Sequence, residues 1–228
     1  MSKSKANDAL NIGFLVFPGI TILDAIGPAE VLANVPGAKV HTIWKTRESV
    51  NTKTGFEFTP STSMDDAPLL DVLCIPGGYG INALLNDEKC IDFVQQQAKQ
   101  AKYVTSVCTG ALLLGAAGLL KGRKAATHWA WLEKLSYFGA IPTAERVVSD
   151  GNIITGGGVT AGIDFALTLV TKLCDENVAK LIQLSLEYDP KPPFDSGSPK
   201  SAAPELVKIA RDRLAQREAH FDDSFNTQ

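Results

Sequence analysis

Short, nearly continuous apolar runs alternate along the chain with longer segments in which apolar residues recur at helical spacing. The strand-like runs occupy residues 11–17, 39–45, 71–76 and 102–107. Helical patterns occupy residues 21–35, 88–101, the Ala- and Leu-rich stretch after Cys108, and residues 128–135, 160–174 and 176–188. Strands that alternate with helices pair in parallel and are covered on both faces, so they can be apolar throughout. The pattern therefore predicts an α/β sandwich.

Three local features modify this pattern. The stretch RVVSDGNIITGGG at residues 146–158 predicts a hairpin, with a turn at Asp150-Gly151. Pro28 lies inside the helical pattern of residues 21–35, so that helix either begins near Pro28 or is kinked there. Asp175 separates the last two helical patterns.

The chain divides into three parts by composition. Residues 1–8 are polar and are expected to be a disordered N-terminus, and residues 9–188 are expected to form one α/β domain. Residues 189–228 begin with several prolines, which favour an extended arm, and continue with the amphipathic spacing of a C-terminal helix. Such an arm can pack on its own domain or on a partner subunit.

Composition and charge exclude several classes of protein. The chain has 228 residues, 45% of them hydrophobic and 21% charged, and a net charge of -3, so no basic surface for nucleic acid is expected. No apolar run approaches the roughly 20 residues that span a membrane, and the start has no signal-peptide core. The four cysteines lack the paired spacing of a disulfide framework or a zinc ribbon. We expect a reduced, cytoplasmic protein with no membrane or nucleic-acid partner.

Cys108 differs from the other three cysteines because it lies where a strand meets the first turn of a helix. Free N–H groups and the helix dipole favour an anion there, which predicts a lowered thiol pKa and a reactive side chain. Gly110 has no side chain to crowd the sharp turn. Ligands of open α/β sheets also bind beyond the carboxyl ends of strands. The other cysteines fit packing or passive surface positions.

Asp24 is the candidate acid, because it lies among apolar neighbours in TILDAIGPAEVL. Burial and a nearby thiolate would both raise its pKa and make it a proton donor. It could equally be a helix cap or a solvated residue, and Glu30 is the alternative acid. No histidine follows Cys108, and His128 is expected to be structural.

Two glycine-rich loops follow strands, at residues 76–80 (PGGYG) and 155–162 (TGGGVTAG). Successive glycines allow backbone N–H groups to point into one space and bind a negative charge. We expect Gly77, Gly78 and Tyr79 to bind substrate. The second loop is a weak signal, and neither loop has the spacing of a dinucleotide or P-loop motif.

Taken together, FPGITILDAIGPAEVL, DVLCIPGGYG, VTSVCTGALLLGAAGLLKGRKAATHW and TGGGVTAGIDFAL resemble the ThiJ/PfpI superfamily of glutamine-amidotransferase-like proteins. The resemblance runs in order over most of the chain. It implies a flavodoxin-like three-layer sandwich with a mostly parallel central sheet, a nucleophile elbow and a homodimer. Cys108 falls on the family nucleophile, Asp24 on its acidic partner, and Thr109 on the residue beside the cysteine.

Thr109 distinguishes branches of the superfamily. Many protease-like relatives carry a histidine directly after the cysteine, whereas threonine at this position is similar to the branch that hydrates isonitriles. The resemblance thus implies addition of water to a small-molecule isonitrile to give an N-substituted formamide, through a thioimidate on Cys108. This chemistry requires no metal or organic cofactor.

Alternatives come from other functional classes. A ligand or redox sensor without hydratase activity could use the same thiol, and glyoxalase-like or amidase-like hydrolysis could use the same scaffold. AraC-type regulators carry a similar sensor domain followed by a DNA-binding domain. About 40 residues follow the expected domain of this chain, which we expect to be too few for two helix-turn-helix units.

Overall fold

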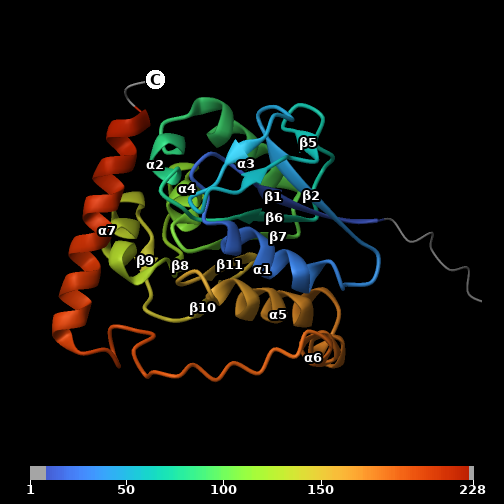
Figure 1. Ribbon diagram of the computed structural model, residues 1–228. Coiled ribbons are helices and arrows are strands. Elements are labelled where there is room, and N and C mark those ends of the chain that lie inside the picture. Colours follow the sequence, from blue (N-terminus) through green and yellow to red (C-terminus); the bar gives the residue numbers. More distant parts are fainter. Residues whose placement is uncertain (1–8, 226–228) are drawn as a thin grey trace, which may run out of the picture.

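The computed structural model describes residues 9–225, with side chains as far as residue 216 (Figure 1). The predicted disorder of residues 1–8 lies outside this range. A seven-stranded sheet forms the middle layer, in the order β10-β11-β7-β6-β1-β2-β5. Its strands are β1 (Leu10–Leu15), β2 (Ala38–Trp44), β5 (Thr62–Ser63), β6 (Val72–Ile75), β7 (Tyr103–Val107), β10 (Val147–Asp150) and β11 (Ile153–Gly156). Every pair is parallel except β10 with β11.

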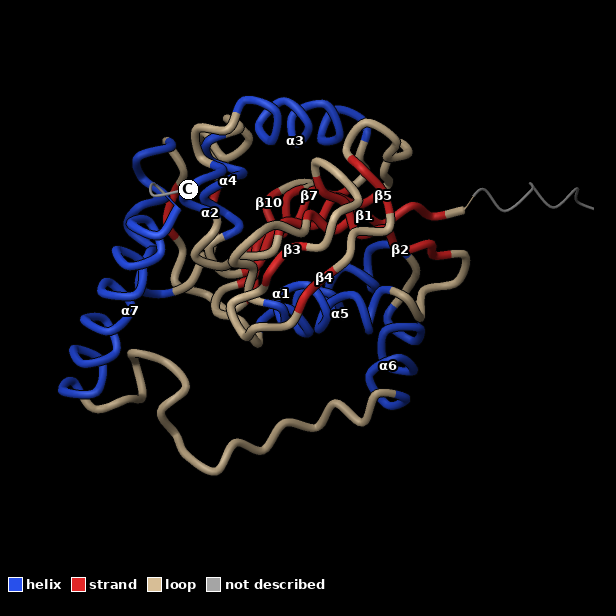
Figure 2. Tube along the Cα trace, turned by 45° about the horizontal axis from the view of Figure 1, so that its top comes forward, coloured by secondary structure: helices blue, strands red, loops and turns tan. Residues whose placement is uncertain are grey.

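Helices cover both faces of this sheet (Figure 2). On one face lie α1 (Ile22–Leu32) and α5 (Ala161–Leu173), and on the other lie α3 (Glu88–Gln100) and α4 (Gly110–Ala116). The three-layer, mostly parallel α/β architecture predicted from the sequence is confirmed. The four predicted strands and the hairpin are present, and Gly151 at the hairpin turn has a φ of 62°.

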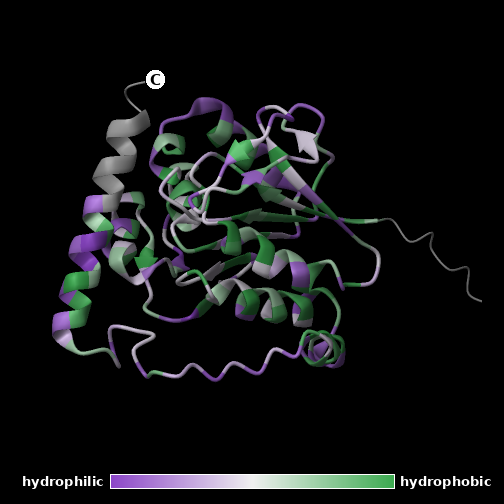
Figure 3. Cartoon of the chain, in the orientation of Figure 1, coloured by the Kyte–Doolittle hydropathy of each residue, from purple (hydrophilic) through white to green (hydrophobic). Residues whose placement is uncertain are grey.

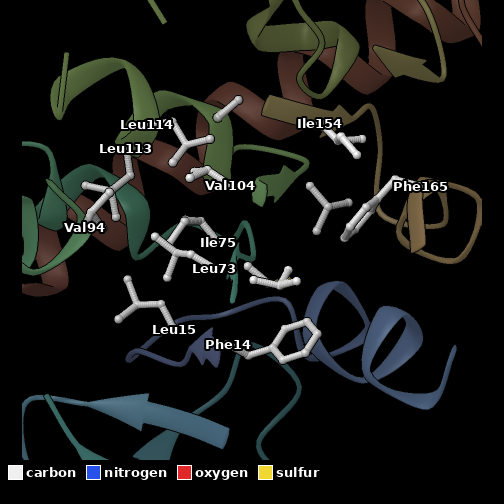
Figure 4. Close-up of a cluster of buried hydrophobic side chains, with 14 of the residues drawn as sticks. Phe14, Leu15, Leu73, Ile75, Val94, Val104, Leu113, Leu114, Ile154 and Phe165 are labelled. Carbon is white, nitrogen blue, oxygen red and sulfur yellow. The ribbon is translucent and has the colours of Figure 1, made fainter. Parts of the chain in front are cut away.

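Apolar side chains of the strands and helices interlock in the core (Figure 4). Buried residues of the sheet include Phe14, Leu73, Ile75, Val104 and Ile154, and those of the helices include Val94, Leu113, Leu114 and Phe165. Because the strands are covered on both faces, their side chains are buried whichever way they point.

The helix expected around Pro28 begins well before it, at Ile22, so the alternative of a start near Pro28 is wrong. Asp175 caps α6 (Glu176–Ser185) by accepting a hydrogen bond from the Val178 N–H at 3.0 Å, which explains the predicted break. The predicted helix at residues 128–135 is a 3₁₀ helix, η1 (Trp129–Phe138).

Several short elements were not predicted, because two to four residues carry no readable periodicity. They are β3 (Val50–Asn51), β4 (Glu57–Phe58), β5, α2 (Ile81–Leu84), β8 (Lys124–Ala125) and β9 (Ile141–Pro142).

Residues 189–203 form an exposed segment without helix or strand, which runs beneath the domain to α7 (Pro204–Phe225) (Figures 1 and 2). Hydrophobic and hydrophilic residues alternate along the part of α7 coloured in Figure 3. Helix α7 returns to its own domain, where the Arg211 guanidinium lies 5.1 Å from the ring centre of Trp129 in η1. Among the described helices, none combines the length and apolar character needed to cross a membrane.

Candidate active site

Cys108 occupies a sharp turn between β7 and α4. Its φ of 55° lies in the left-handed region, which side chains other than glycine rarely adopt. Such a conformation costs on the order of 1–3 kcal/mol and persists only where surrounding contacts impose it. The turn is tight, because a Cβ at Gly110 would lie 2.1 Å from the Ile75 carbonyl oxygen, so the predicted need for glycine there is confirmed.

Hydrogen bonds to the Cys108 backbone from elsewhere in the chain hold this turn. The Cys108 N–H donates to the carbonyl oxygens of Gly157 at 2.7 Å and Gly156 at 3.2 Å. The Thr127 hydroxyl donates to the Cys108 carbonyl at 2.6 Å. The second glycine-rich loop therefore supports the elbow, a role that its weak sequence signal did not indicate.

Asp24 is fully buried in the first turn of α1. Its Oδ2 accepts a hydrogen bond from the Gly77 N–H at 3.0 Å. Within the described part of the chain Oδ1 has no such partner, and the Cys108 thiol lies against the carboxyl. Burial raises the pKa of Asp24 to about 7, although the Gly77 N–H, the Cys108 thiol and the charge of Lys53 each lower it. Glu30 is exposed, so of the two candidate acids only Asp24 is buried beside Cys108.

The pKa of Cys108 moves in the direction opposite to the sequence prediction. Burial and the charge of Asp24 raise it well above its ordinary value, while the Thr109 N–H and hydroxyl lower it by a smaller amount. The expected effect of the helix start is therefore present but outweighed, because a thiolate beside a buried carboxylate is both desolvated and repelled. The prediction of a lowered thiol pKa was wrong.

The two side chains thus titrate as a pair. Below about pH 7 both carry a proton, and above it the pair holds one proton and one negative charge. In that state the carboxylate can take the thiol proton as the sulfur attacks, and can then deliver the proton elsewhere. Above about pH 7 the pair therefore has a thiol and a carboxylate that share one proton and one negative charge.

Asp24→Asn is expected to change how stability depends on pH. Between its ordinary pKa of 3.8 and about 7 the carboxyl is protonated when folded and ionised when unfolded, so wild-type stability falls as the pH rises. The neutral amide of the variant does not titrate, so its stability does not fall in this way. The free energy of unfolding of the variant minus that of wild type should therefore rise by about 1.4 kcal/mol per pH unit up to about pH 7 and stay constant above it. Urea denaturation across this range measures it, and a pH-independent difference would contradict a raised pKa.

Thr109 ties the elbow to the loop at residues 76–80. Its hydroxyl oxygen accepts from the Gly78 N–H at 2.9 Å, and the hydroxyl lies 3.1 Å from the Gly78 carbonyl as a donor. The N–H groups of Gly77 and Gly78 are thus used by Asp24 and Thr109. They are therefore not free to bind the anion that the sequence predicts, because both already donate to side chains of the protein.

Thr109→Val should destabilise the fold by about 1–2 kcal/mol, because the Gly78 N–H loses its acceptor in a partly buried position. Thr109→Ser keeps the hydroxyl and is the matched control, which should lose far less. Urea denaturation compares the two, and equal losses would show that the hydroxyl is not the stabilising group.

A cavity of about 110 Å³ opens above Cys108 and Thr109. Gly78 and Tyr79 line it as predicted, whereas Gly77 does not and lies behind them, where an added Cβ would be 2.8 Å from the Cys108 Cβ. The remaining lining residues were not predicted: Thr21, Lys53, Asn82, His128, Trp131, Val159 and Leu214. They come from separate segments, and of these the second glycine-rich loop, which contains Val159, gave only a weak sequence signal.

His128 borders the cavity as a neutral side chain. Burial and the charge of Lys53 lower its pKa to about 4. Its Nδ1 accepts from the Ala130 N–H at 3.3 Å, and its ring packs edge-on against Trp131. The expectation of a structural histidine fits these contacts. The Lys53 ammonium lies 5.2 Å from the ring centre of Tyr79, so one positive charge lies beside the cavity.

Comparison with known proteins agrees with this geometry. The chain is 55% identical over 207 residues to the isonitrile hydratase of Pseudomonas putida, covering 91% of each chain. It is 32% identical over 168 residues to the HTH-type transcriptional regulator GbdR of Pseudomonas aeruginosa, of which it covers 46%. A solved ThiJ/PfpI family protein from Pseudomonas syringae superposes with a TM-score of 0.89 at 40% identity, covering 96% of this chain and 94% of that one.

The DJ-1/PfpI family model matches residues 11–172, which include α1, the elbow and both glycine-rich loops. The resemblance seen in the sequence motifs is therefore confirmed, and the chain belongs to the DJ-1/PfpI family.

Proposed function

We propose that this protein hydrates isonitriles, adding water to R–N≡C to give the N-substituted formamide R–NH–CHO. The observation that carries the proposal is the buried Cys108–Asp24 pair, whose cysteine lines a cavity together with aromatic and apolar side chains and the charged Lys53. The similarity to the P. putida isonitrile hydratase over nearly the whole chain supports the same reaction.

The first half of the reaction forms a thioimidate. The Cys108 sulfur attacks the terminal carbon of the isonitrile while its proton passes to the Asp24 carboxylate, and Asp24 then delivers that proton to the same carbon. An S–C bond and a C–H bond form, the S–H bond breaks, and the product is R–N=CH–S–Cys108. Asp24 returns to its carboxylate. Proton transfer by a placed side chain typically contributes ~10²–10⁴ in rate.

The second half consumes one water. The oxygen of the water adds to the thioimidate carbon while the Asp24 carboxylate accepts a proton from that water. Asp24 then passes the proton to the substrate nitrogen. The C–S bond of the adduct then breaks, the hydroxyl proton returns to sulfur, and the formamide leaves. The Thr109 N–H and hydroxyl lower the pKa of the thiol, which favours its departure from the adduct.

We also propose that the protein is a lyase with a cysteine nucleophile and that it works in the cytoplasm as a homodimer, without a cofactor or a nucleic-acid partner. A redox sensor without hydratase activity has less support, because peroxide reacts with thiolates and both burial and Asp24 disfavour the thiolate here.

Purified protein incubated with an aromatic isonitrile tests the proposal. Formation of the N-aryl formamide, followed by absorbance and identified by mass spectrometry, is the expected result. Absence of turnover with both aromatic and alkyl isonitriles would overturn it.

A further inference from the structure

Helix α7 lies beyond the residues that the family model matches, 11–172, yet it contributes Leu214 to the cavity that contains Cys108. In Figure 1 the helix stands along one side of the domain, next to α2. Part of the wall of the candidate active site therefore comes from a C-terminal element that the matched family region does not contain.

Contacts between α7 and η1 position Leu214 at the cavity. Arg211 lies over Trp129, and a groove between the two helices is lined by Trp129 and by apolar residues of α7 that include Leu206 and Ile209. His128 and Leu214 border both this groove and the Cys108 cavity. Leu214 is half-buried and packs against the core, and its side chain lies between the two spaces.

The shape of the substrate places its substituent among the lining residues of the cavity. An isonitrile is linear at nitrogen, so R extends from the reacting carbon along the axis of the C≡N bond and must be accommodated by the side chains that line the cavity around Cys108. The cavity floor is formed by Cys108 and Thr109, whereas Trp131, Val159 and Leu214 are apolar lining residues drawn from other elements. Because the cavity has a volume of only about 110 Å³, a change in one lining side chain changes which substituents fit.

We propose that α7 is the wall that limits the size of the group carried to Cys108, and that Leu214 is its specificity-determining residue. If the substrate is an isonitrile, as proposed above, the group that Leu214 selects is its substituent R, and this part of the inference rests on the proposed function. The limit that α7 sets on the size of any group reaching Cys108 does not depend on it. Leu214 packs against the substituent and takes no part in proton transfer.

Leu214→Ala tests the proposal with two substrates, tert-butyl isonitrile and the bulkier 1-naphthyl isonitrile. The ratio of kcat/KM for the naphthyl over the tert-butyl compound should rise about tenfold or more, because the variant both makes room for the larger group and loses contact with the smaller. Leu206→Ala is the matched control. It makes the same substitution on the same helix but lines only the outer groove, so the ratio should stay as in wild type.

Alkylation of Cys108 supplies a readout that needs no hydration. Iodoacetamide and its N-naphthyl derivative are compared by mass spectrometry of the peptide that contains Cys108, and Leu214→Ala should accelerate the bulky reagent selectively. Unchanged ratios in both assays would overturn the role of Leu214. A shifted alkylation ratio in a protein that hydrates no isonitrile would support the wall and overturn the proposed reaction.

Discussion

Cys108→Ala is expected to lower kcat/KM for isonitrile hydration by roughly 10⁴–10⁶-fold, as when the nucleophile of a covalent mechanism is removed. In the proposed mechanism the sulfur is the atom that bonds to the isonitrile carbon, and within the part of the chain that the structure describes no other cysteine lines the cavity. Without it, Asp24 has neither a thiol proton to transfer nor an adduct to hydrolyse. Initial rates of formamide formation measure the effect.

The matched control is Cys174→Ala, because Cys174 is an exposed free thiol at the end of α5. It should keep wild-type rates. Alanine at a φ of 55° retains the backbone strain of Cys108, so thermal unfolding of the variant separates loss of chemistry from loss of fold. Cys108→Ser, which is closer in size, provides a second check. Substantial turnover in a folded Cys108→Ala variant would rule out the covalent route.

Trapping the intermediate tests the same step from the other side. Wild-type protein quenched in acid during turnover should carry a mass increase equal to that of the isonitrile, located on the peptide that contains Cys108. Acid quenching suits the experiment because it protonates Asp24, the base proposed to activate water.

The second large effect is expected for Asp24→Asn, which should lower kcat/KM by about 10²–10⁴-fold, the usual contribution of a general acid–base residue. The amide oxygen can still accept the Gly77 N–H, so the loop contact is kept while the proton transfer is lost. Glu30→Gln is the control, because Glu30 is an exposed acid on the same helix and should leave the rate unchanged.

The pH profile identifies the group responsible. Wild-type kcat/KM should rise with pH through about 7, where the pair loses its first proton, and then level off. Asp24→Asn should lack this limb. His128 cannot replace it, because its pKa of about 4 lies well below that range. A limb near pH 7 that survived in Asp24→Asn would assign the titration to another group.

The framework of the fold could be predicted from the sequence because it depends on local patterns. Apolar runs such as residues 71–76 identify strands that are buried on both faces, and their alternation with helices requires parallel pairing. The turn at Asp150-Gly151 and the break at Asp175 were likewise encoded by residues adjacent in the chain. Strands of two residues, such as β3 and β5, carry too few positions for a pattern to appear.

The candidate site could be predicted only in part, for the same reason. The elbow at Cys108 was visible because strand, cysteine, glycine and helix follow one another directly. The supports of the elbow were not, since Thr127 and Gly157 contact Cys108 from other segments. The choice between Asp24 and Glu30 also needed the fold, because burial separates two acids on one helix.

The sequence by itself determined the α/β architecture, the strand-to-helix turn at Cys108 and, through its motifs, the family. Tertiary structure alone decided that burial and Asp24 raise the pKa of Cys108, that the N–H groups of Gly77 and Gly78 bind side chains rather than an anion, and that Leu214 lines the cavity. The physical reason is distance. Strands, turns and helix starts are set by neighbours along the chain, whereas desolvation, charge repulsion and cavity shape depend on groups that meet only after folding.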